Sequence, residues 1–390
     1  VAQRLRQAAK KFTKVSIVSV GGDDQLIKLH QNFTVSPAHL VLVVAAIAKA
    51  AAYAKGVPAI TGFDGIEPCE KAKAIAQSLI EGEKRHIFLG NVAEQHPQAA
   101  ALHALVQELA KLTGATFGFL SEAANSVGGY VAGLLPTANG LNAYEMLAQP
   151  RKAYVVLGTE LDRDAHNAQL ATSALKQAAF SVVLTPFKDG NAAETADALL
   201  PIAPFTETSG TFVNAEGRVQ GFNGVVAPLG EARPGWKVLR VLGNVLGLSG
   251  FDFMSSEAVR DTVVSAKAEF VSGLDNGLKD VVATMAAAPE GLQRIADVPI
   301  HFADMLARRS PALQLTRDAA APTARMSAAT LAQAGVADGA SVTVKQGNGS
   351  AALVANADET VPAGCVRVSA AHATTAGLGD LFGAITVERA

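Results

Sequence analysis

Short apolar runs alternate with longer segments of helical periodicity along the first half of the chain. Residues Val15 to Val20 are rich in β-branched side chains and end at two glycines, as a buried strand does. Helix-boundary residues follow: Ser36 can cap the N-terminus, Pro37 suits the first turn, and Gly56 can follow the last turn. The apolar residues between them lie nearly all round, so we expect a helix that is covered on several sides.

The same alternation predicts the next elements. Helices are expected at residues 68–80, 97–112 and 164–177, and strands at residues 85–89, 153–157, 181–185 and 198–202. Continuous apolar strands joined by helices are typical of a parallel sheet that is covered on both faces. The sequence therefore predicts an α/β fold with an open, doubly wound, mostly parallel sheet.

The pattern changes near Pro299. Residues 319–322 are loop-like, and Ser327 opens a brief helix that Gly335 ends. Residues 341–345 then alternate polar and apolar, residues 347–349 (Gly-Asn-Gly) turn the chain, and residues 351–355 and 365–369 supply further strands. We predict a separate small β-barrel domain.

Charge and hydropathy exclude two classes of partner. The 390 residues carry 33 basic and 35 acidic side chains, a formal charge of −2, so no long-range field attracts nucleic acid. The longest apolar run, Leu40 to Ala48, stops at Lys49, short of the roughly 20 residues that cross a bilayer. We expect neither nucleic-acid binding nor direct membrane insertion.

Cysteine limits the metal chemistry. An iron–sulfur cluster normally takes four thiolates, and this chain has only Cys69 and Cys365, neither of them in a C-x-x-C motif. His96 and His103 are not at the i, i+4 spacing of zinc ligands. We expect no metal site and two free, buried thiols; a single disulfide is the alternative.

Two generic catalytic motifs fail when each position is checked. Gly230 and Gly235 have the first spacing of a P-loop, but Trp236 stands where the lysine belongs. Residues 173–176 match S-x-x-K by letters, yet they lie in an amphipathic helix without the companion motifs. We predict no catalytic residue.

One polar segment, Ala196 to Gln220, is the candidate binding site. A strand ends near Pro201, and loops at the carboxyl ends of parallel strands are where ligands bind in open α/β sheets. A loop whose polar side chains only join neighbouring elements is an equally good interpretation from physics alone. The candidate binding residues are Glu207, Gly210, Thr211, Asn214, Glu216 and Arg218.

This segment resembles the signature of the molybdopterin oxidoreductase superfamily, which includes formate dehydrogenases and periplasmic nitrate reductases. More narrowly, the chain is similar to the large iron–sulfur subunit of proteobacterial NADH:quinone oxidoreductase (complex I). The similarity extends through residues 222–226 and 230–240, with shorter matches at 89–91, 95–97, 122–130 and 381–387. It spans nearly the whole chain.

The resemblance implies a division into domains. Residues 1–60 would be the end of an inserted nucleotide-fold domain, residues 61–300 a formate dehydrogenase-like α/β domain, and residues 301–390 a barrel of the kind that covers molybdopterin dinucleotide. In catalytic relatives the loop from Glu207 to Gln220 approaches the pterin, so the six candidates would be cofactor-binding residues. A second arginine is common where this chain has Gly217, which implies that the site is vestigial.

The resemblance also implies a function. The chain would be a structural C-terminal part of the subunit that passes electrons from NADH and flavin towards quinone, with no redox centre of its own. Iron–sulfur clusters would lie in an N-terminal half upstream of Val1, since the sequence looks like a cut inside a longer protein, and molybdopterin would be lost. Its partners would be that half and other peripheral-arm subunits, and the complex would be cytoplasmic and peripheral to the inner membrane.

Two other functions stay open. The chain could be the cofactor-covering half of an active molybdopterin-dependent dehydrogenase, which the retained Glu207, Asn214 and Arg218 favour. The α/β alternation and the Gly21-Gly22 pair suggest a plain nucleotide-binding module.

Overall fold

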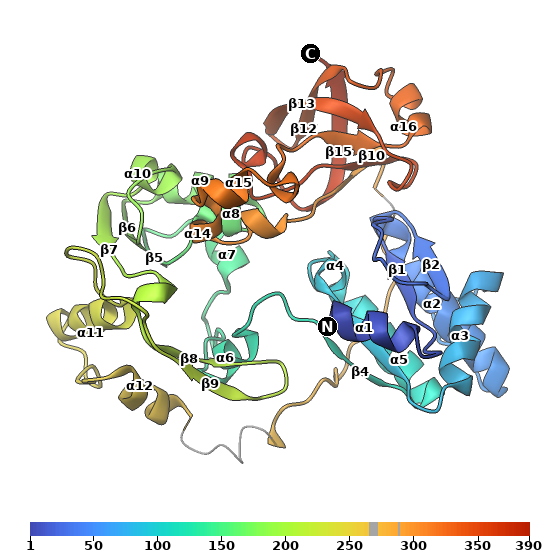
Figure 1. Ribbon diagram of the computed structural model, residues 1–390, viewed down its shortest axis with the longest axis horizontal. Coiled ribbons are helices and arrows are strands. Elements are labelled where there is room, and N and C mark those ends of the chain that lie inside the picture. The colour runs from blue at the N-terminus through green and yellow to red at the C-terminus, as the bar shows by residue number, and fades with distance from the viewer. Residues whose placement is uncertain (265–271, 288) are drawn as a thin grey trace.

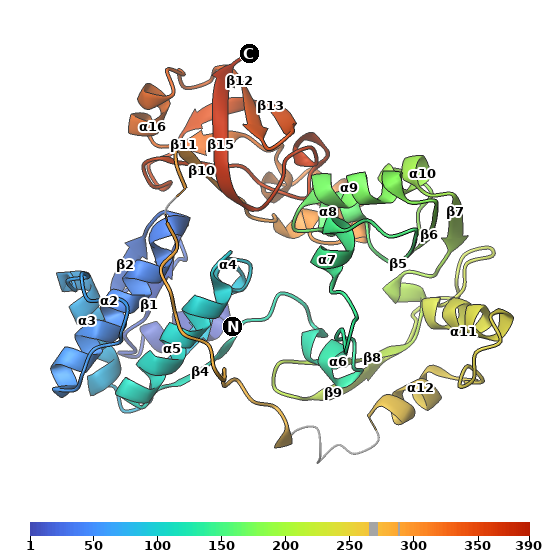
Figure 2. The same cartoon turned by 180° about the vertical axis from the view of Figure 1, so that it is seen from behind.

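The computed structural model describes residues 1–264, 272–287 and 289–390. The elements form three groups, coloured blue to cyan, green to yellow, and orange to red in Figure 1. We call them the N-terminal lobe (residues 1–125), the sheet lobe (126–264) and the barrel lobe (292–390). Figure 2 shows from behind that residues 272–287 run along the N-terminal lobe.

The N-terminal lobe has two small parallel sheets and a helical core. Strand β1 (Ser16–Ser19) pairs with β2 (Gln31–Thr34), and β3 (His86–Leu89) pairs with β4 (Thr116–Phe119). The helices are α1 (Ala2–Ala9), α2 (Pro37–Lys55), α3 (Glu70–Glu81), α4 (Asn91–Glu94) and α5 (Ala99–Thr113).

Helix α2 confirms most of its predicted boundary chemistry. Pro37 lies in the first turn, and Gly56 follows the last turn with φ 65°. Ser36 does not cap the helix backbone, because its hydroxyl is hydrogen-bonded to Nδ1 of His39 at 2.6 Å. Among the described helices, α2 alone is long and apolar enough to cross a membrane, and 67% of its apolar window is buried inside the fold, as expected of a core helix.

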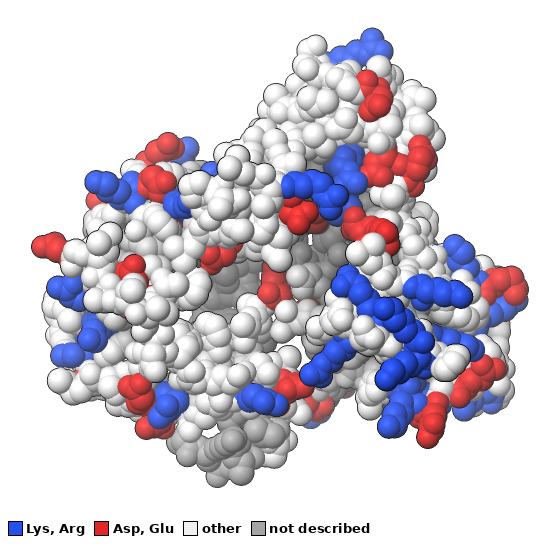
Figure 3. All heavy atoms as spheres, viewed as in Figure 1, with Lys and Arg blue, Asp and Glu red and all other residues white. Residues whose placement is uncertain are grey.

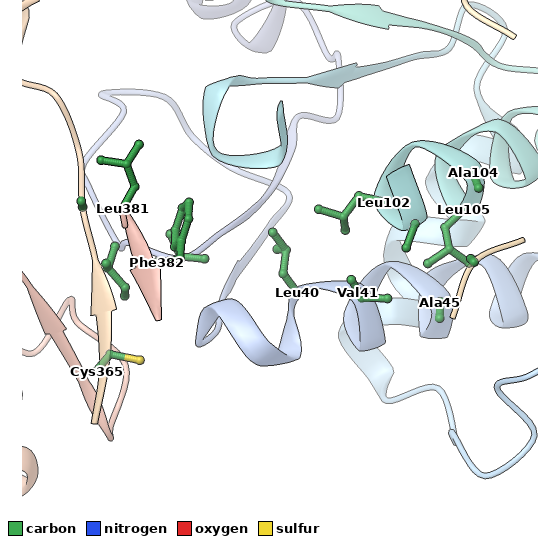
Figure 4. Packing of buried hydrophobic residues seen from close by; sticks show 14 of the residues in the cluster. Leu40, Val41, Ala45, Leu102, Ala104, Leu105, Cys365, Leu381 and Phe382 are labelled. Carbon is green, nitrogen blue, oxygen red and sulfur yellow. The ribbon is translucent and has the colours of Figure 1, made fainter. Parts of the chain in front are cut away.

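The predicted boundary at residue 60 falls inside one hydrophobic core. Ala51 of α2 packs with Ala72 of α3 and Leu109 of α5, so these three helices form a single unit. A second cluster continues into the barrel lobe, where Phe382 packs towards Leu40. Figure 4 shows Leu40 of α2 and Leu102 of α5 on one side and Phe382 of the barrel on the other.

The sheet lobe has a parallel three-stranded sheet in the order β5-β6-β7. The strands are β5 (Ala153–Leu157), β6 (Phe180–Thr185) and β7 (Ala198–Pro201). An antiparallel hairpin, β8 (Gly210–Val213) and β9 (Val219–Phe222), follows. The helices are α6 (Ser126–Val131), α7 (Ala143–Ala148), α8 (Leu161–Asp164), α9 (Ala168–Gln177), α10 (Asn191–Thr195), α11 (Gly235–Val245) and α12 (Ser256–Val263).

The barrel lobe confirms the predicted closed barrel, with the strand order β10-β14-β11-β13-β12-β15. Its strands are β10 (Leu292–Ile295), β11 (Ala324–Met326), β12 (Ser341–Gln346), β13 (Gly349–Ala357), β14 (Cys365–Arg367) and β15 (Phe382–Arg389). Helix α16 (Ala328–Gln333) lies at the barrel, whereas α14 (Met305–Arg308) and α15 (Pro311–Gln314) lie beside α8 and α9 of the sheet lobe (Figure 1). The barrel begins at Leu292, ahead of the predicted residue 301, because β10 pairs with both β14 and β15.

The α/β class with parallel strands is confirmed. Outside the barrel, however, the parallel strands of the described residues belong to three separate sheets of two or three strands rather than to one open sheet. Apolar periodicity identifies a strand but not its neighbours, so this division could not be seen in the sequence.

Candidate functional site

The polar segment that the sequence singled out is a hairpin and not the predicted loop. After the 3-10 turn η1 (Phe205–Glu207), β8 and β9 pair with Thr211 opposite Gly221. Phe212 and Phe222 pack edge to face with their ring centroids 4.9 Å apart. These aromatic and β-branched residues favour strand pairing over an open loop.

The polar groups of the hairpin tip form hydrogen bonds with one another. The side-chain oxygen of Asn214 accepts hydrogen bonds from the backbone N–H groups of Glu216 (3.0 Å) and Arg218 (2.9 Å). Gly217 has φ 75°, a conformation that disfavours an arginine at this position. Nη2 of Arg218 lies 3.8 Å from Oε2 of Glu216, and both side chains are exposed. The tip therefore brings three of the six candidates together.

The other candidates lie apart from the tip. Gly210 packs against Phe222, since a Cβ on Gly210 would lie 2.6 Å from that ring. Glu207 Oε2 accepts a hydrogen bond from the backbone N–H of Leu229 at 3.1 Å. Of the six candidates only Glu207 lines a surface cavity of about 500 Å³, which it shares with Ser209, Arg233, Trp236, Lys237 and Ser256.

The carboxyl end of the β5-β6-β7 sheet carries an ion-pair cluster that sequence reasoning missed. Arg308 at the end of α14 donates from Nη1 to Glu160 Oε2 at 2.7 Å and from Nη2 to Asp164. Arg309 donates from Nη2 to Glu160 Oε1 at 2.6 Å and to Asp189 Oδ1 at 2.8 Å. We call these five residues the arginine clasp.

Burial makes the clasp a tight electrostatic unit. The Arg308 side chain is 7% exposed and the Glu160 side chain 14%. Burial raises the pKa of Glu160, but hydrogen bonds from Arg309 and Arg308 outweigh it and hold that pKa below its usual value. The hydrogen bond from Arg309 likewise lowers the pKa of Asp189. All three carboxylates are therefore engaged by the two arginines.

Packing orients the second arginine of the clasp. The Arg309 guanidinium lies over the ring of Phe187, 4.1 Å from its centroid, and Arg309 Nη1 donates to the backbone carbonyl of Met305 at 3.1 Å. Glu160 follows β5 and Asp189 follows β6, where ligand-binding loops of α/β sheets lie. The paired arginines were visible in the sequence, but nothing local identified partners more than a hundred residues away.

The Gly21-Gly22 pair has a structural role. The Gly22 backbone N–H donates to the carbonyl of Thr360 in the barrel lobe at 3.0 Å. A Cβ on Gly22 would lie 3.0 Å from Cβ of Thr360. Close approach of the two backbones therefore accounts for Gly22.

The two thiols are free, but only one is buried. Cys365 is fully buried, and burial raises its pKa to about 12. Cys69, predicted to be buried, is exposed because it precedes the first turn of α3 at the surface.

Comparison with known proteins gives relatives of several activities. A probable oxidoreductase, YjgC, of Bacillus subtilis is 35% identical over 117 residues, 29% of this chain and 12% of that protein. A nitrate reductase of Synechocystis is 32% identical over 33% of this chain and 19% of its own. The mitochondrial NADH-ubiquinone oxidoreductase 78 kDa subunit of Candida albicans is 32% identical over 31% of this chain and 18% of its own. The matched segments thus span less than a fifth of each relative.

Structure comparison supports the fold over the whole chain. Acetylene hydratase from Pelobacter acetylenicus aligns with a TM-score of 0.69 and 13% identity, covering 100% of this chain and 75% of the other. The family model of molybdopterin oxidoreductases matches residues 1–245, more than half of the chain. The chain therefore belongs to the molybdopterin oxidoreductase family.

Proposed function

We propose that this chain is the structural C-terminal part of the large iron–sulfur subunit of a complex I-type NADH:quinone oxidoreductase. In this role it holds no redox centre and supports a cluster-bearing half of the same subunit, which passes electrons from NADH and flavin towards quinone. The arginine clasp is the observation that carries the proposal. The 32% identity to the Candida albicans 78 kDa subunit is consistent with it.

The residues at the sheet edge do not fit a pterin dinucleotide. Such a cofactor carries a pyrophosphate, which proteins bind with free cations and backbone N–H groups. Both arginines at this edge are bound to Glu160, Asp164 and Asp189 instead. Figure 3 shows acidic side chains around the central hollow, with basic ones beside them at its upper rim, whereas the largest group of Lys and Arg lies over helix α1.

The polar residues in and before the hairpin are also a poor fit to a pterin dinucleotide. Asn214 is occupied by its own turn, and Glu207 by the backbone of Leu229. Arg218 is an exposed cation beside Glu216, with glycine next to it at residue 217. We propose that the site formed by Glu207, Gly210, Thr211, Asn214, Glu216 and Arg218 is vestigial and that molybdopterin has been lost. The partners in this proposal are other peripheral-arm subunits, and the assembly is cytoplasmic and peripheral to the inner membrane.

A second function has specific support. Nitrate reductase and YjgC are at least as similar to this chain as the complex I subunit is, at 32% and 35% identity against 32%. The alternative is that the chain covers the cofactor of an active molybdopterin-dependent dehydrogenase. In that case the clasp would have to open, releasing two cations at the sheet edge.

Metal analysis of the purified full-length subunit separates the two. Iron together with less than about 0.1 molybdenum or tungsten per chain supports the proposal, since cofactor enzymes of this kind carry a full metal equivalent. Stoichiometric molybdenum would refute it. Co-purification with flavin- and quinone-linked NADH oxidation in the membrane fraction is the second expected result, and isolation as a separate dehydrogenase contradicts it.

A further inference from the structure

Basic side chains gather at one place on the N-terminal lobe. Residues 1–14 hold five basic and no acidic side chains, whereas the whole chain has a formal charge of −2. Most of them lie in or next to helix α1, and Figure 3 shows the largest group of Lys and Arg over this helix. Such a cluster in a nearly neutral protein creates a local positive potential.

Three of these cations have no anionic partner in the described part of the chain. Nζ of Lys14 lies 3.3 Å from Oε2 of Glu81, and Nε of Arg6 donates to the backbone carbonyl of Gln25 at 3.4 Å. The other three side chains are exposed and form no ion pair or hydrogen bond with any described residue: Arg4, Lys10 and Lys11. Their charges are therefore available to a partner.

An exposed aromatic residue directly follows these cations in the chain. Phe12 is 98% exposed, and its backbone has φ 74°, which is uncommon for a bulky residue. Aromatic and arginine side chains are among those that contribute most to protein–protein contacts. We call Arg4, Lys10, Lys11 and Phe12 the basic patch.

Helix stability explains only part of the basic patch. Cations at the C-terminal end of a helix interact favourably with its dipole, which accounts for Lys10 and Lys11. Arg4, however, lies in the first turn of α1, where a cation is unfavourable. Phe12 contributes almost nothing to the core of the lobe, since its ring is in solvent. A partner that covers the patch accounts for all four side chains.

The surroundings of the basic patch favour a small acidic partner over a membrane. A membrane-binding helix presents apolar side chains beside its cations, but Leu5, Ala8 and Ala9 of α1 are partly buried in the lobe. Acidic residues also bound the patch: Glu81 at the end of α3, and Asp24 in the loop that contacts α1. An extended anionic surface would meet these carboxylates, whereas a short acidic segment would not.

We propose that the basic patch docks an acidic segment of another protein, in which carboxylates face the three free cations and an apolar side chain packs on Phe12. This inference rests on the proposed function, because it names the docking face and the chemistry of one neighbouring subunit in the assembly. Complementary charges give such a contact its specificity, and the exposed ring gives it an apolar centre. The contact should weaken as the ionic strength rises.

Photocrosslinking in the intact assembly tests the proposal. A photoreactive side chain replaces Phe12 in the full-length subunit, and the captured peptide is sequenced from complexes in their native membrane fraction. The expected product is a peptide of a different protein that is rich in Asp and Glu. Arg4→Glu, Lys10→Glu and Lys11→Glu together should lower its yield at least about tenfold, and high salt should lower it as well.

Two control variants separate charge from folding. Exposed cations at other places form the first control, and their reversal should leave the yield unchanged: Lys84→Glu, Lys152→Glu and Lys176→Glu. The second control keeps the charge of the patch, with Arg4→Lys, Lys10→Arg and Lys11→Arg, and should retain the crosslink. Thermal unfolding of each variant checks that the fold is intact.

Other products overturn the inference. A crosslink to a phospholipid, to a second copy or to the same polypeptide contradicts an acidic partner, and so does the absence of any crosslink. Equal yields from the reversed patch and the unchanged patch also contradict it. Sedimentation with vesicles of equal parts phosphatidylcholine and phosphatidylglycerol should show no binding that depends on the patch.

Metal content, measured on the same preparations, distinguishes a failure of this inference from a failure of the proposed function. A molybdenum-containing subunit that captures the acidic peptide would refute the proposed function and keep the docking face. A molybdenum-free subunit that captures lipid would refute the docking face alone.

Discussion

Arg309 Nη2 lies 2.6 Å from Glu160 Oε1, joining the end of α14 to the residue that follows β5. This pair connects the barrel lobe to the sheet lobe at the edge where ligands of α/β sheets usually bind. Arg308 shares the same carboxylate. One glutamate therefore holds two arginines, and the clasp depends on its charge.

Replacing Glu160 by glutamine should destabilise the contact between these lobes by about 3 kcal/mol, because two partly buried guanidinium groups lose their common partner. Urea unfolding and hydrogen exchange at α14 measure the effect. The matched control is Glu388→Gln, which breaks the exposed pair with Lys345 and should cost less than about 1 kcal/mol. Equal losses in the two variants would contradict a clasp.

Gly349→Ala should weaken the contact between the barrel and helix α9 of the sheet lobe. A Cβ at residue 349 would lie 1.7 Å from the carbonyl oxygen of Gly377 and 2.5 Å from Nε2 of Gln169 on α9. Overpacking of this kind typically costs about 1–3 kcal/mol. Gly65→Ala is the control, since nothing lies within 4 Å of its added Cβ. Differential scanning calorimetry should show a lower transition for Gly349→Ala only.

The sequence predicted the elements better than their assembly. Pro37 and Gly56 bounded α2 correctly because capping is local chemistry, and the turn at Gly347 placed β12 and β13. The hairpin of β8 and β9 was missed because the polar residues around Thr211, Phe212 and Val213 are typical of a loop, although these three residues favour a strand. The clasp was missed for a different reason: ion pairs between distant residues leave no periodic signal.

Acidification should weaken the contact between the N-terminal lobe and the barrel through His96, whose ring centroid lies 5.6 Å from that of Phe382 in β15. Burial lowers the pKa of this histidine from its usual 6.5, although a hydrogen bond to the Pro37 carbonyl opposes the shift. Nδ1 accepts from the backbone N–H of Gln98, so protonation of Nδ1 breaks that bond. Because the folded pKa is depressed, this stabilisation is present above about pH 6.5 and is lost as the pH falls.

A loss of about 1 kcal/mol between pH 7.5 and 5.5 corresponds to roughly 2–4 °C in melting temperature for a domain of this size. His96→Gln should show a smaller pH dependence of stability than the wild type. His372, whose pKa is also lowered by burial and by Arg163, should contribute to the dependence that remains. If the melting temperature of His96→Gln depended on pH as that of the wild type does, this explanation would be wrong.

Thiol labelling checks how tightly the barrel closes on the N-terminal lobe. Cys365 belongs to the hydrophobic cluster that joins them, is fully buried, and has a pKa raised to about 12, so little thiolate forms at pH 8. Exposed Cys69 should react with an aromatic disulfide reagent within minutes, and Cys365 at least about 100-fold more slowly, because the thiolate is the reactive form and must first become accessible. In the Cys69→Ser variant the fast phase should vanish, and denaturant should restore one reactive thiol. Fast labelling of Cys365 in the native variant would mean that the barrel separates readily from α2 and α5, and would contradict a tight contact between them.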